Sequence, residues 1–479
     1  MVKPDCVHRG DSAPPTRREF IAAAAGAVAA ARSPWRDAIA PPPARPVPSA
    51  SQLLWQRDEL ALFLHFGVNT FTDREWGDGK EDPAIFAPSA LDAGQWARTA
   101  RQTGARAMIL TAKHHDGFCL WPSRTTQHSV ARSSWRSGQG DVVREFVDAC
   151  RVNGLRAGLY CSPWDRNATV YGDSPRYNDF YCDQLTELLT RYGPIHEVWF
   201  DGANGEGPNG RKQVYDWPRV FALVRKLQPN AVIFSDAGPD IRWIGNEHGE
   251  AGDPNWSTVN PALVPYPGAS GDGVTEALLH GDPDGPLWRP GETDTSIRPG
   301  WFHHPAEDDQ VHTVEELIQL HFTSVGRNSK LLLNVPPTRD GLLHATDVAR
   351  LTQMRRSLDT LFRQDLVGDR TFTWRATGAR SAVAELELGV PGQSVMVGIA
   401  DLREEIERGQ VVARYRLEGS NGGDWRTLSR GTTIGYRKLD RFAPQAVRRV
   451  RFIVEDAVAT PQPVRLRLFA ADSAAVTRE

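Results

Sequence analysis

Polar and aromatic side chains able to do acid/base chemistry follow four apolar segments in the first half of the chain. The four clusters are His65-Phe66-Gly67, Lys113-His114-His115-Asp116-Gly117-Phe118, Tyr160-Cys161-Ser162-Pro163-Trp164-Asp165 and Trp199-Phe200-Asp201-Gly202. In barrel enzymes the catalytic groups project from the carboxyl ends of the strands. Four such clusters in succession therefore predict one crowded polar site.

Asp201 is the leading candidate for a catalytic group. It ends a strongly apolar segment, and Gly202 is expected to let the backbone turn away directly after it. A buried carboxylate is costly unless donors hold it ionised, and histidines and an arginine nearby are expected to do so. Retaining glycosidases need such a carboxylate, with a protonated second one roughly 5 to 5.5 Å away. The alternative from the pattern alone is an aspartate that caps the next helix.

The adjacent histidines His114 and His115 have two interpretations. Successive strand residues face opposite sides, so the two converge only where the strand gives way to its loop. Ligand pairs on strands more often skip a residue, so the pattern favours hydrogen bonds to hydroxyl groups over a metal ion. No metal or other cofactor is expected. A metal-dependent barrel hydrolase using both histidines and Asp116 remains the alternative.

Strand-like and helix-like segments alternate over about 300 residues, which predicts a parallel sheet covered by helices. The size favours a (β/α)₈-type barrel over residues 49–365, and no glycine-rich dinucleotide fingerprint follows the first strand. The expected strands are Ala61–Gly67, Arg106–Lys113, Arg156–Ser162, Glu197–Gly202, Ala231–Asp236 and Lys330–Val335. The expected helices lie near Ala90–Thr103, Asp141–Asn153, Asp179–Tyr192 and Trp217–Leu227, and Thr313 with Glu316 predicts a capping box.

Two later regions differ in character. Between Ile241 and Asp309 the chain is rich in Gly, Pro, Trp, His and acidic residues, which predicts active-site loops. The last barrel strands are poorly marked, so closure of the barrel is an inference. Residues 366–479 carry short strands and turns and predict a C-terminal all-β sandwich.

The composition is that of a globular protein, with 479 residues and a formal net charge of −3. No long basic run is present, so nucleic acid is not an expected partner. The 15 Trp exceed the 9 Tyr, which fits either sugar-binding faces or a large core. Residues 1–48 combine Arg17-Arg18, a short apolar run and a Pro/Ala-rich stretch, which predicts a twin-arginine signal and a linker.

Export by that route predicts a periplasmic or secreted protein. The apolar run is too short to span a membrane, and no later segment reaches that length, so the mature chain is expected to hold no integral membrane segment. Twin-arginine substrates fold before export, in a reducing compartment, so free buried thiols are expected instead of disulfides. The cysteines of the mature chain are Cys119, Cys150, Cys161 and Cys182.

Five segments together resemble glycoside hydrolase family 29, the α-L-fucosidases. They are Phe63-Leu64-His65-Phe66-Gly67, Glu75-Trp76-Gly77, Leu110–Phe118, Glu197–Gly202 and Leu331-Leu332-Leu333-Asn334-Val335-Pro336-Pro337. The resemblance implies a retaining double displacement in which Asp201 attacks the anomeric carbon of fucose, the substrate being a fucosylated oligosaccharide or glycoconjugate. It also implies fucose contacts from His65, Glu75, Trp76, His114, His115, Tyr160 and Trp199.

The acid/base residue varies in position within the family. Segments 245–258 and 296–301 resemble the branch that acts on α-1,3/1,4-linked fucose, where the glutamate of an Asn-Glu pair is the acid/base, which implies Glu247 here. Glu292 is the second candidate, whereas Glu250 and Asp253 are expected to shape the loop. Arg298 and Trp301 are expected substrate contacts of the same loops.

The C-terminal segments resemble the discoidin-type β-sandwich of the same branch. Packing against the barrel without a ligand is favoured over carbohydrate binding. Three functional alternatives stay open beside an α-L-fucosidase specific for α-1,3/1,4 linkages. They are a broad-specificity or α-1,2-acting fucosidase, a metal-dependent hydrolase, and an inactive fucosylated-glycan-binding protein. The sequence gives no prediction of oligomeric state.

Overall fold

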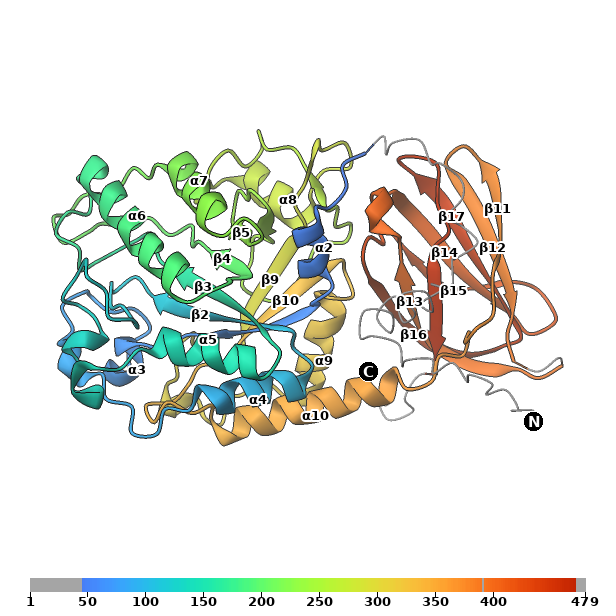
Figure 1. The fold of residues 1–479 in the computed structure, drawn as a ribbon. Helices are drawn as coiled ribbons and strands as arrows, with labels where there is room; N and C mark the ends of the chain where they lie inside the picture. The colour runs from blue at the N-terminus through green and yellow to red at the C-terminus, as the bar shows by residue number, and fades with distance from the viewer. Residues whose placement is uncertain (1–44, 390–391, 471–479) are drawn as a thin grey trace, which may run out of the picture. The chain divides into compact units, whose positions relative to one another are not determined.

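The computed structural model describes residues 45–389 and 392–470, so the predicted export signal lies almost entirely outside the described residues. Its first domain is a closed parallel barrel with the strand order β1-β10-β9-β6-β5-β4-β3-β2 (Figure 1). The strands are β1 (Leu60–Leu64), β2 (Ala107–Lys113), β3 (Arg156–Cys161), β4 (Glu197–Trp199), β5 (Val232–Ser235), β6 (Ile241–Trp243), β9 (Gly291–Ser296) and β10 (Ser329–Asn334). The predicted barrel is confirmed.

Side chains of the apolar barrel strands alternate between two apolar layers. In β1, Leu60, Leu62 and Leu64 pack outward against the helices, whereas Ala61 and Phe63 pack inside the barrel. Every residue of this strand is buried, because both faces of a parallel sheet are covered. This explains why the strands form nearly continuous apolar runs in the sequence.

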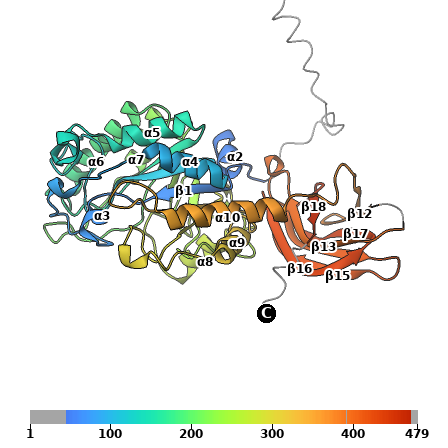
Figure 2. The ribbon, with the colours of Figure 1, turned by 90° about the horizontal axis from the view of Figure 1, so that it is seen from below.

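A ring of helices covers the outside of the barrel (Figure 1). The described helices of this domain are α2 (Ala50–Gln56), whose Trp55 packs with the inner layer, and α3 (Val68–Thr72), α4 (Ala93–Thr103), α5 (Val142–Val152), α6 (Ser174–Arg191), α7 (Trp217–Leu227), α8 (Asp272–His280), α9 (Val314–Thr323) and α10 (Ala345–Leu361). The capping box of Thr313 and Glu316 at the start of α9 is confirmed. The last helix, α10, packs beside α4 and α9 and so completes the ring (Figure 2).

The stretch from Ile241 to Asp309 was expected to be loops, and that expectation is wrong in part. It contains the barrel strands β6 and β9, helix α8 and the two-stranded ribbon of β7 (Thr258–Val259) and β8 (Leu287–Trp288). Only residues 236–240 separate β5 from β6, so no helix fits between these two strands. The strand β6 is three residues long, and β9 carries polar side chains, so neither shows an apolar run.

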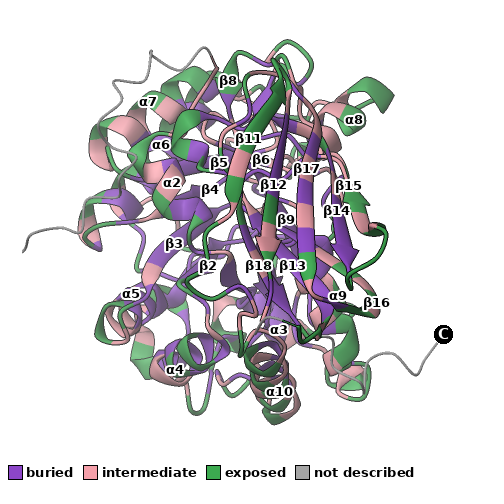
Figure 3. Ribbon diagram, turned by 90° about the vertical axis from the view of Figure 1, so that its right-hand side faces the viewer, coloured by how far each residue is buried: buried purple, intermediate pink, exposed green. Residues whose placement is uncertain are grey.

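The second domain packs a five-stranded antiparallel sheet, β11-β12-β17-β14-β15, against a three-stranded one, β16-β13-β18. Buried and exposed residues alternate along several of these strands (Figure 3). This agrees with the predicted sandwich. The strands are β11 (Thr373–Gly378), β12 (Ser381–Glu387), β13 (Val395–Arg403), β14 (Val412–Ser420), β15 (Arg426–Gly431), β16 (Lys438–Val447), β17 (Arg449–Ala457) and β18 (Arg465–Phe469).

Buried polar contacts join the sandwich to the barrel domain within one compact unit. Gln410 accepts a hydrogen bond from the backbone N–H of Ser257 at 2.7 Å and donates to the carbonyl of Asn255 at 3.0 Å. Arg437 pairs with Asp401 at 3.0 Å and also contacts Glu59 beside β1. These contacts support the expectation that the sandwich packs against the barrel.

The sequence also predicted free buried thiols and no integral membrane segment in the mature chain. Cys119, Cys150, Cys161 and Cys182 are all free and buried, as predicted. Within the described ranges, no helix combines the length and the apolar character needed to cross a lipid bilayer.

Candidate active site

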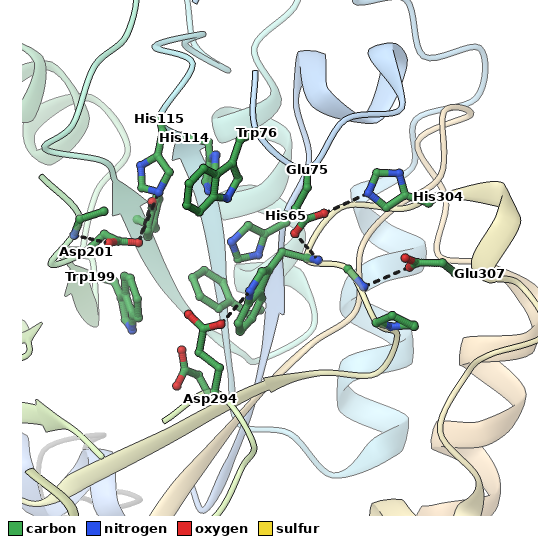
Figure 4. Close-up of a pocket in the computed structure, with 17 residues that line it drawn as sticks. His65, Glu75, Trp76, His114, His115, Trp199, Asp201, Asp294, His304 and Glu307 are labelled. Atoms are coloured by element: carbon green, nitrogen blue, oxygen red, sulfur yellow. Dashed lines mark hydrogen bonds and ion pairs between the residues drawn. The ribbon is translucent and has the colours of Figure 1, made fainter. Parts of the chain in front are cut away.

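A pocket of about 500 Å³ opens at the carboxyl ends of the barrel strands (Figure 4). Polar and aromatic side chains from five strand ends and three loops converge on it. The lining residues are Phe63, His65, Glu75, Trp76, His114, His115, Tyr160, Trp199, Asp201, Ala203, Glu247, Asp294, Pro299, Gly300, Trp301, His304 and Glu307. The structure thus brings together every predicted site residue except Arg298.

Asp201 follows β4 and lies at the wall of this pocket with 26% of its side chain exposed. The Tyr160 hydroxyl donates a hydrogen bond to its Oδ2 at 3.2 Å, and the backbone N–H of Ala203 donates to its Oδ1 at 2.6 Å. The Nε2 atom of His115 lies 3.8 Å from Oδ2. The carboxylate is therefore held by donors and stays open to a ligand.

Two details of the Asp201 prediction need correction. The pocket lining contains no arginine, so the expected guanidinium partner is replaced by a phenol and a backbone amide. Gly202 does not adopt a left-handed conformation, and its role is instead steric, because a Cβ there would overlap the Asp236 carboxylate. The helix-cap alternative also fails, since the next helix starts at Trp217 and is capped by Asp216.

Three of the four histidines that line the pocket, His65, His114 and His115, are buried. Desolvation lowers the pKa of His65 to about 3 and also lowers the pKa of His114 and His115. His65 Nδ1 lies 2.8 Å from Asn334 Oδ1, and His115 Nδ1 lies 2.7 Å from Ser162 Oγ. A neutral imidazole with one nitrogen engaged presents its other nitrogen to a ligand as donor or acceptor. These rings are thus suited to binding hydroxyl groups.

His114 and His115 converge because β2 ends one residue before them. Their ring centroids are 4.1 Å apart, and both rings line the pocket. Among residues 45–389 and 392–470, no group of three or more His, Cys, Asp and Glu side chains is arranged to hold a metal ion. The two rings thus converge where the strand gives way to its loop, as the sequence led us to expect.

Glu75 fastens the loop that carries Trp301. Its carboxylate accepts hydrogen bonds from the backbone N–H groups of Trp301 at 2.6 Å and Phe302 at 3.3 Å, and lies 3.0 Å from His304 Nε2. The adjacent Trp76 is 57% exposed at the edge of the pocket. An exposed indole beside a polar pocket offers an apolar face to a sugar ring. The Glu75 and Trp76 pair thus shapes one wall.

Glu247 lies on the loop after β6, facing the same pocket as Asp201. Desolvation raises its pKa, and the nearby charges of Asp201 and Glu75 raise it further, whereas a hydrogen bond from Trp301 Nε1 at 3.4 Å opposes them. A carboxyl group with a raised pKa beside an ionised one is the arrangement that a general acid needs. Glu247 is suited to that role.

Glu292, the second acid/base candidate, lies outside the pocket. Its side chain is wholly buried in the middle of the barrel, where its Oε2 lies 3.2 Å from Lys330 Nζ and its Oε1 accepts a hydrogen bond from Trp199 Nε1 at 3.0 Å. It therefore supports the floor of the pocket. Asp253 shapes its loop as expected, since it pairs with Lys438 and accepts from Thr432 in the sandwich.

The structure contradicts the expected substrate contact of Arg298. The guanidinium is buried away from the pocket, donating from Nε and Nη2 to both oxygens of Asp347 at 3.0 and 2.9 Å and from Nη1 to Asp308 at 2.8 Å. A buried bidentate pair of this kind fixes geometry. Arg298 therefore anchors the loop that presents Trp301.

Three ionisable pocket residues were missed from the sequence: Asp294, His304 and Glu307. Asp294 lies near the end of β9, a strand whose inward side chains are polar. The signal was the spacing of Glu292, Asp294 and Ser296, since alternate residues of a strand face the same side, although the threonines between them are polar too. Glu307 accepts the backbone N–H of Gly300 at 3.1 Å, a contact with no sequence signature.

A parallel barrel whose strand ends gather carboxyl groups and aromatic rings around one pocket is typical of glycoside hydrolases. Comparison with known proteins specifies the family. A family model described as alpha-L-fucosidase matches residues 68–360. The chain is 42% identical over 446 residues to alpha-L-fucosidase 1 of Arabidopsis thaliana, covering 88% of this chain and 86% of that protein.

Solved structures agree with this assignment. A glycoside hydrolase 29 family member from an unknown rumen bacterium is 40% identical, with a TM-score of 0.82, covering 90% of this chain and 78% of that one. A Ruminococcus gnavus GH29 fucosidase in complex with fucose is 30% identical, with a TM-score of 0.82, covering 91% and 97%. The chain belongs to the α-L-fucosidases of glycoside hydrolase family 29.

Proposed function

We propose that this protein is a retaining exo-α-L-fucosidase that releases terminal α-1,3/1,4-linked L-fucose from glycans. The observation that carries the proposal is the pairing of Asp201 and Glu247 across one pocket. Asp201 is held by hydrogen-bond donors, while Glu247 has a raised pKa. One carboxylate is thus kept as a nucleophile and the other as an acid.

In the first step, an Asp201 oxygen attacks the anomeric carbon while Glu247 gives its proton to the departing glycosidic oxygen. The C–O bond to the leaving group breaks, and a fucosyl ester of Asp201 forms. In the second step, Glu247 takes a proton from water, whose oxygen attacks the anomeric carbon and frees Asp201. Two displacements at the same carbon return the original configuration.

The remaining lining residues supply binding and shape. The neutral rings of His65, His114 and His115 offer donors and acceptors to the sugar hydroxyls. Trp199 and Trp301 provide apolar surface, which suits the C6 methyl group that distinguishes fucose from most hexoses. The Ruminococcus gnavus relative named above was solved with fucose, which supports this choice of sugar.

Two measurements test the proposal. ¹H NMR of the first product from an aryl α-L-fucoside should show the α-anomer before mutarotation, whereas initial β-fucose would refute retention. Initial rates on α-1,2-, α-1,3- and α-1,4-linked oligosaccharides should favour the last two. The α-1,2 linkage cleaved fastest would refute the linkage assignment, which rests on resemblance in the loops 245–258 and 296–301.

The competing functions make different predictions. Loss of activity in a chelator, with a bound metal in the purified protein, would favour a metal-dependent hydrolase. Binding of fucosylated glycans without turnover, unchanged in Asp201→Ala, would favour a glycan-binding protein. We also propose export through the twin-arginine route, tested by replacing Arg17-Arg18 with lysines and following the protein in the periplasm.

A further inference from the structure

A third carboxyl group, Asp294, lies deeper in the pocket than either proposed catalytic residue. Its side chain is only 4% exposed yet lines the pocket near the carboxyl end of β9. The indole Nε1 of Trp243 donates a hydrogen bond to its Oδ1 at 2.7 Å. This contact fixes the orientation of the carboxyl group and leaves Oδ2 without a hydrogen-bond partner from another residue, on a side chain that lines the pocket (Asp294 is labelled in Figure 4).

The charge balance of the pocket distinguishes Asp294 from its neighbours. The lining contains five acidic side chains and neither lysine nor arginine; the acids are Glu75, Asp201, Glu247, Asp294 and Glu307. Glu75 has His304 and two backbone amides as partners, and Asp201 has a phenol and a backbone amide. Asp294 and Glu247 each accept a hydrogen bond from one neutral indole, and of these two only Asp294 is buried. A buried carboxylate with a single neutral donor is costly to ionise.

Nearby charges act in the same direction. Burial raises the pKa of Asp294 well above its usual range, and the carboxylates of Glu247 and Asp201 raise it further, against the effect of the Trp243 hydrogen bond. The raised pKa favours the protonated form of Asp294. Because Oδ1 accepts from the indole, the proton resides on Oδ2.

We propose that Asp294 is a substrate-binding residue whose Oδ2–H donates a hydrogen bond to a hydroxyl group of the fucosyl ring. The proposal rests on the proposed fucosidase function and adds a residue that the family motifs in the sequence did not mark. Trp243 acts through Asp294 as a positioning residue. The pair differs from Asp201 and Glu247 because neither member transfers a proton or forms a bond to carbon.

Substitution of Asp294 by asparagine and by alanine distinguishes a residue that donates a hydrogen bond from one that must lose its proton. Asp294→Asn keeps the shape and an N–H donor, so kcat/KM should stay within about fivefold of the wild type. Asp294→Ala removes the donor and leaves a buried hydroxyl group of the substrate without a hydrogen-bond partner. This should lower kcat/KM by about 10- to 100-fold. The proposal is overturned if alanine matches the wild type, or if asparagine is as damaging as alanine and azide restores its activity, the mark of a proton-transfer group.

A substrate series provides the matched control. Aryl α-L-fucosides lacking the 2-, 3- or 4-hydroxyl are assayed with the wild type and with Asp294→Ala. One hydroxyl should matter to the wild type and lose most of that effect in the variant, because its partner is gone. Equal losses in both proteins for all three substrates would overturn the proposal. A wild-type protein that releases no fucose would instead refute the proposed function.

Discussion

Two groups of carboxyl side chains occupy the interior of the barrel, and they differ in their partners. In the middle of the barrel, Glu197 and Glu292 share Lys330, whose Nζ lies 2.7 and 3.2 Å from them. At the carboxyl end, Asp201 and Asp294 face a pocket without lysine or arginine. The comparison indicates that the fold places a lysine beside the carboxyl groups that it buries for structure, and neither lysine nor arginine beside those that line the pocket.

Tryptophan side chains donate hydrogen bonds to carboxyl groups both inside the barrel and at the pocket. Each of four interior or pocket carboxyl groups accepts a hydrogen bond from an indole N–H: Trp55 to Glu197 at 2.9 Å, Trp199 to Glu292 at 3.0 Å, Trp243 to Asp294 at 2.7 Å and Trp301 to Glu247 at 3.4 Å. An indole satisfies an acceptor without adding a charge. The excess of tryptophan thus has a third cause beside sugar binding and core packing.

The largest expected effect is the difference between substituting Asp201, just after β4, and substituting Glu197, at the start of β4. Asp201→Gly removes the nucleophile and should lower kcat on an aryl α-L-fucoside on the order of 10⁵-fold, with the melting temperature little changed. The matched control on the same strand, Glu197→Gln, should lower the melting temperature and keep most of kcat. Equal losses of kcat in both variants would erase the distinction between the two groups.

The next effect concerns stability. Lys330→Met leaves Glu197 and Glu292 buried without a cation, and should lower the free energy of unfolding of the barrel by about 3–5 kcal/mol in a denaturant titration. Adding Glu292→Gln removes one stranded carboxyl group and should recover part of the loss. A Lys330→Met variant as stable as the wild type would show that the pairing of Lys330 with Glu197 and Glu292 does not stabilise the barrel.

Glu247→Ala tests the second pocket carboxyl. Without a general acid, kcat/KM on a fucoside with a poor leaving group should fall by about 10²- to 10⁴-fold, whereas a fucoside with a very good leaving group should be affected far less. Azide should restore turnover and yield an α-fucosyl azide, because it replaces the activated water and attacks the β-linked ester of Asp201 with inversion. The same loss with both leaving groups would argue against an acid/base role.

The smallest effect is a shift in pH dependence. Glu247 must be protonated for the first step, so activity should fall as the pH rises through its raised pKa. The Trp301 hydrogen bond stabilises the charged form, so Trp301→Phe should move this basic limb to higher pH by about 0.4 unit, equivalent to ~0.5 kcal/mol. A shift to lower pH, or a limb that persists in Glu247→Gln, would contradict the assignment.

The parts of the fold that could be predicted from sequence are those with an apolar pattern. The continuous apolar runs of β1, β2 and β10 marked the barrel, because both faces of such strands are buried. The strands β6 and β9 escaped because one is three residues long and the other aims polar side chains inward. The polar character of β9 reflects Glu292 inside the barrel and Asp294 at the pocket.

The site residues that could be predicted from the sequence were likewise those with a regular position in the fold. Asp201, His114 and His115 were predicted because they stand next to strand ends, where geometry dictates direction. Arg298 was predicted from resemblance along a loop, and a loop position does not specify where a side chain points. Asp294 had a signal in its period-2 spacing that the polar composition of its strand concealed.

Trapping the covalent intermediate tests the central claim most directly. A fucosyl fluoride carrying a second fluorine at C2 should form the ester and then release it slowly, so that digestion and mass spectrometry can locate the sugar. We predict one added fluorofucosyl group on the peptide that contains Asp201. A label on Glu247 or Asp294, or turnover without any adduct, would contradict the account.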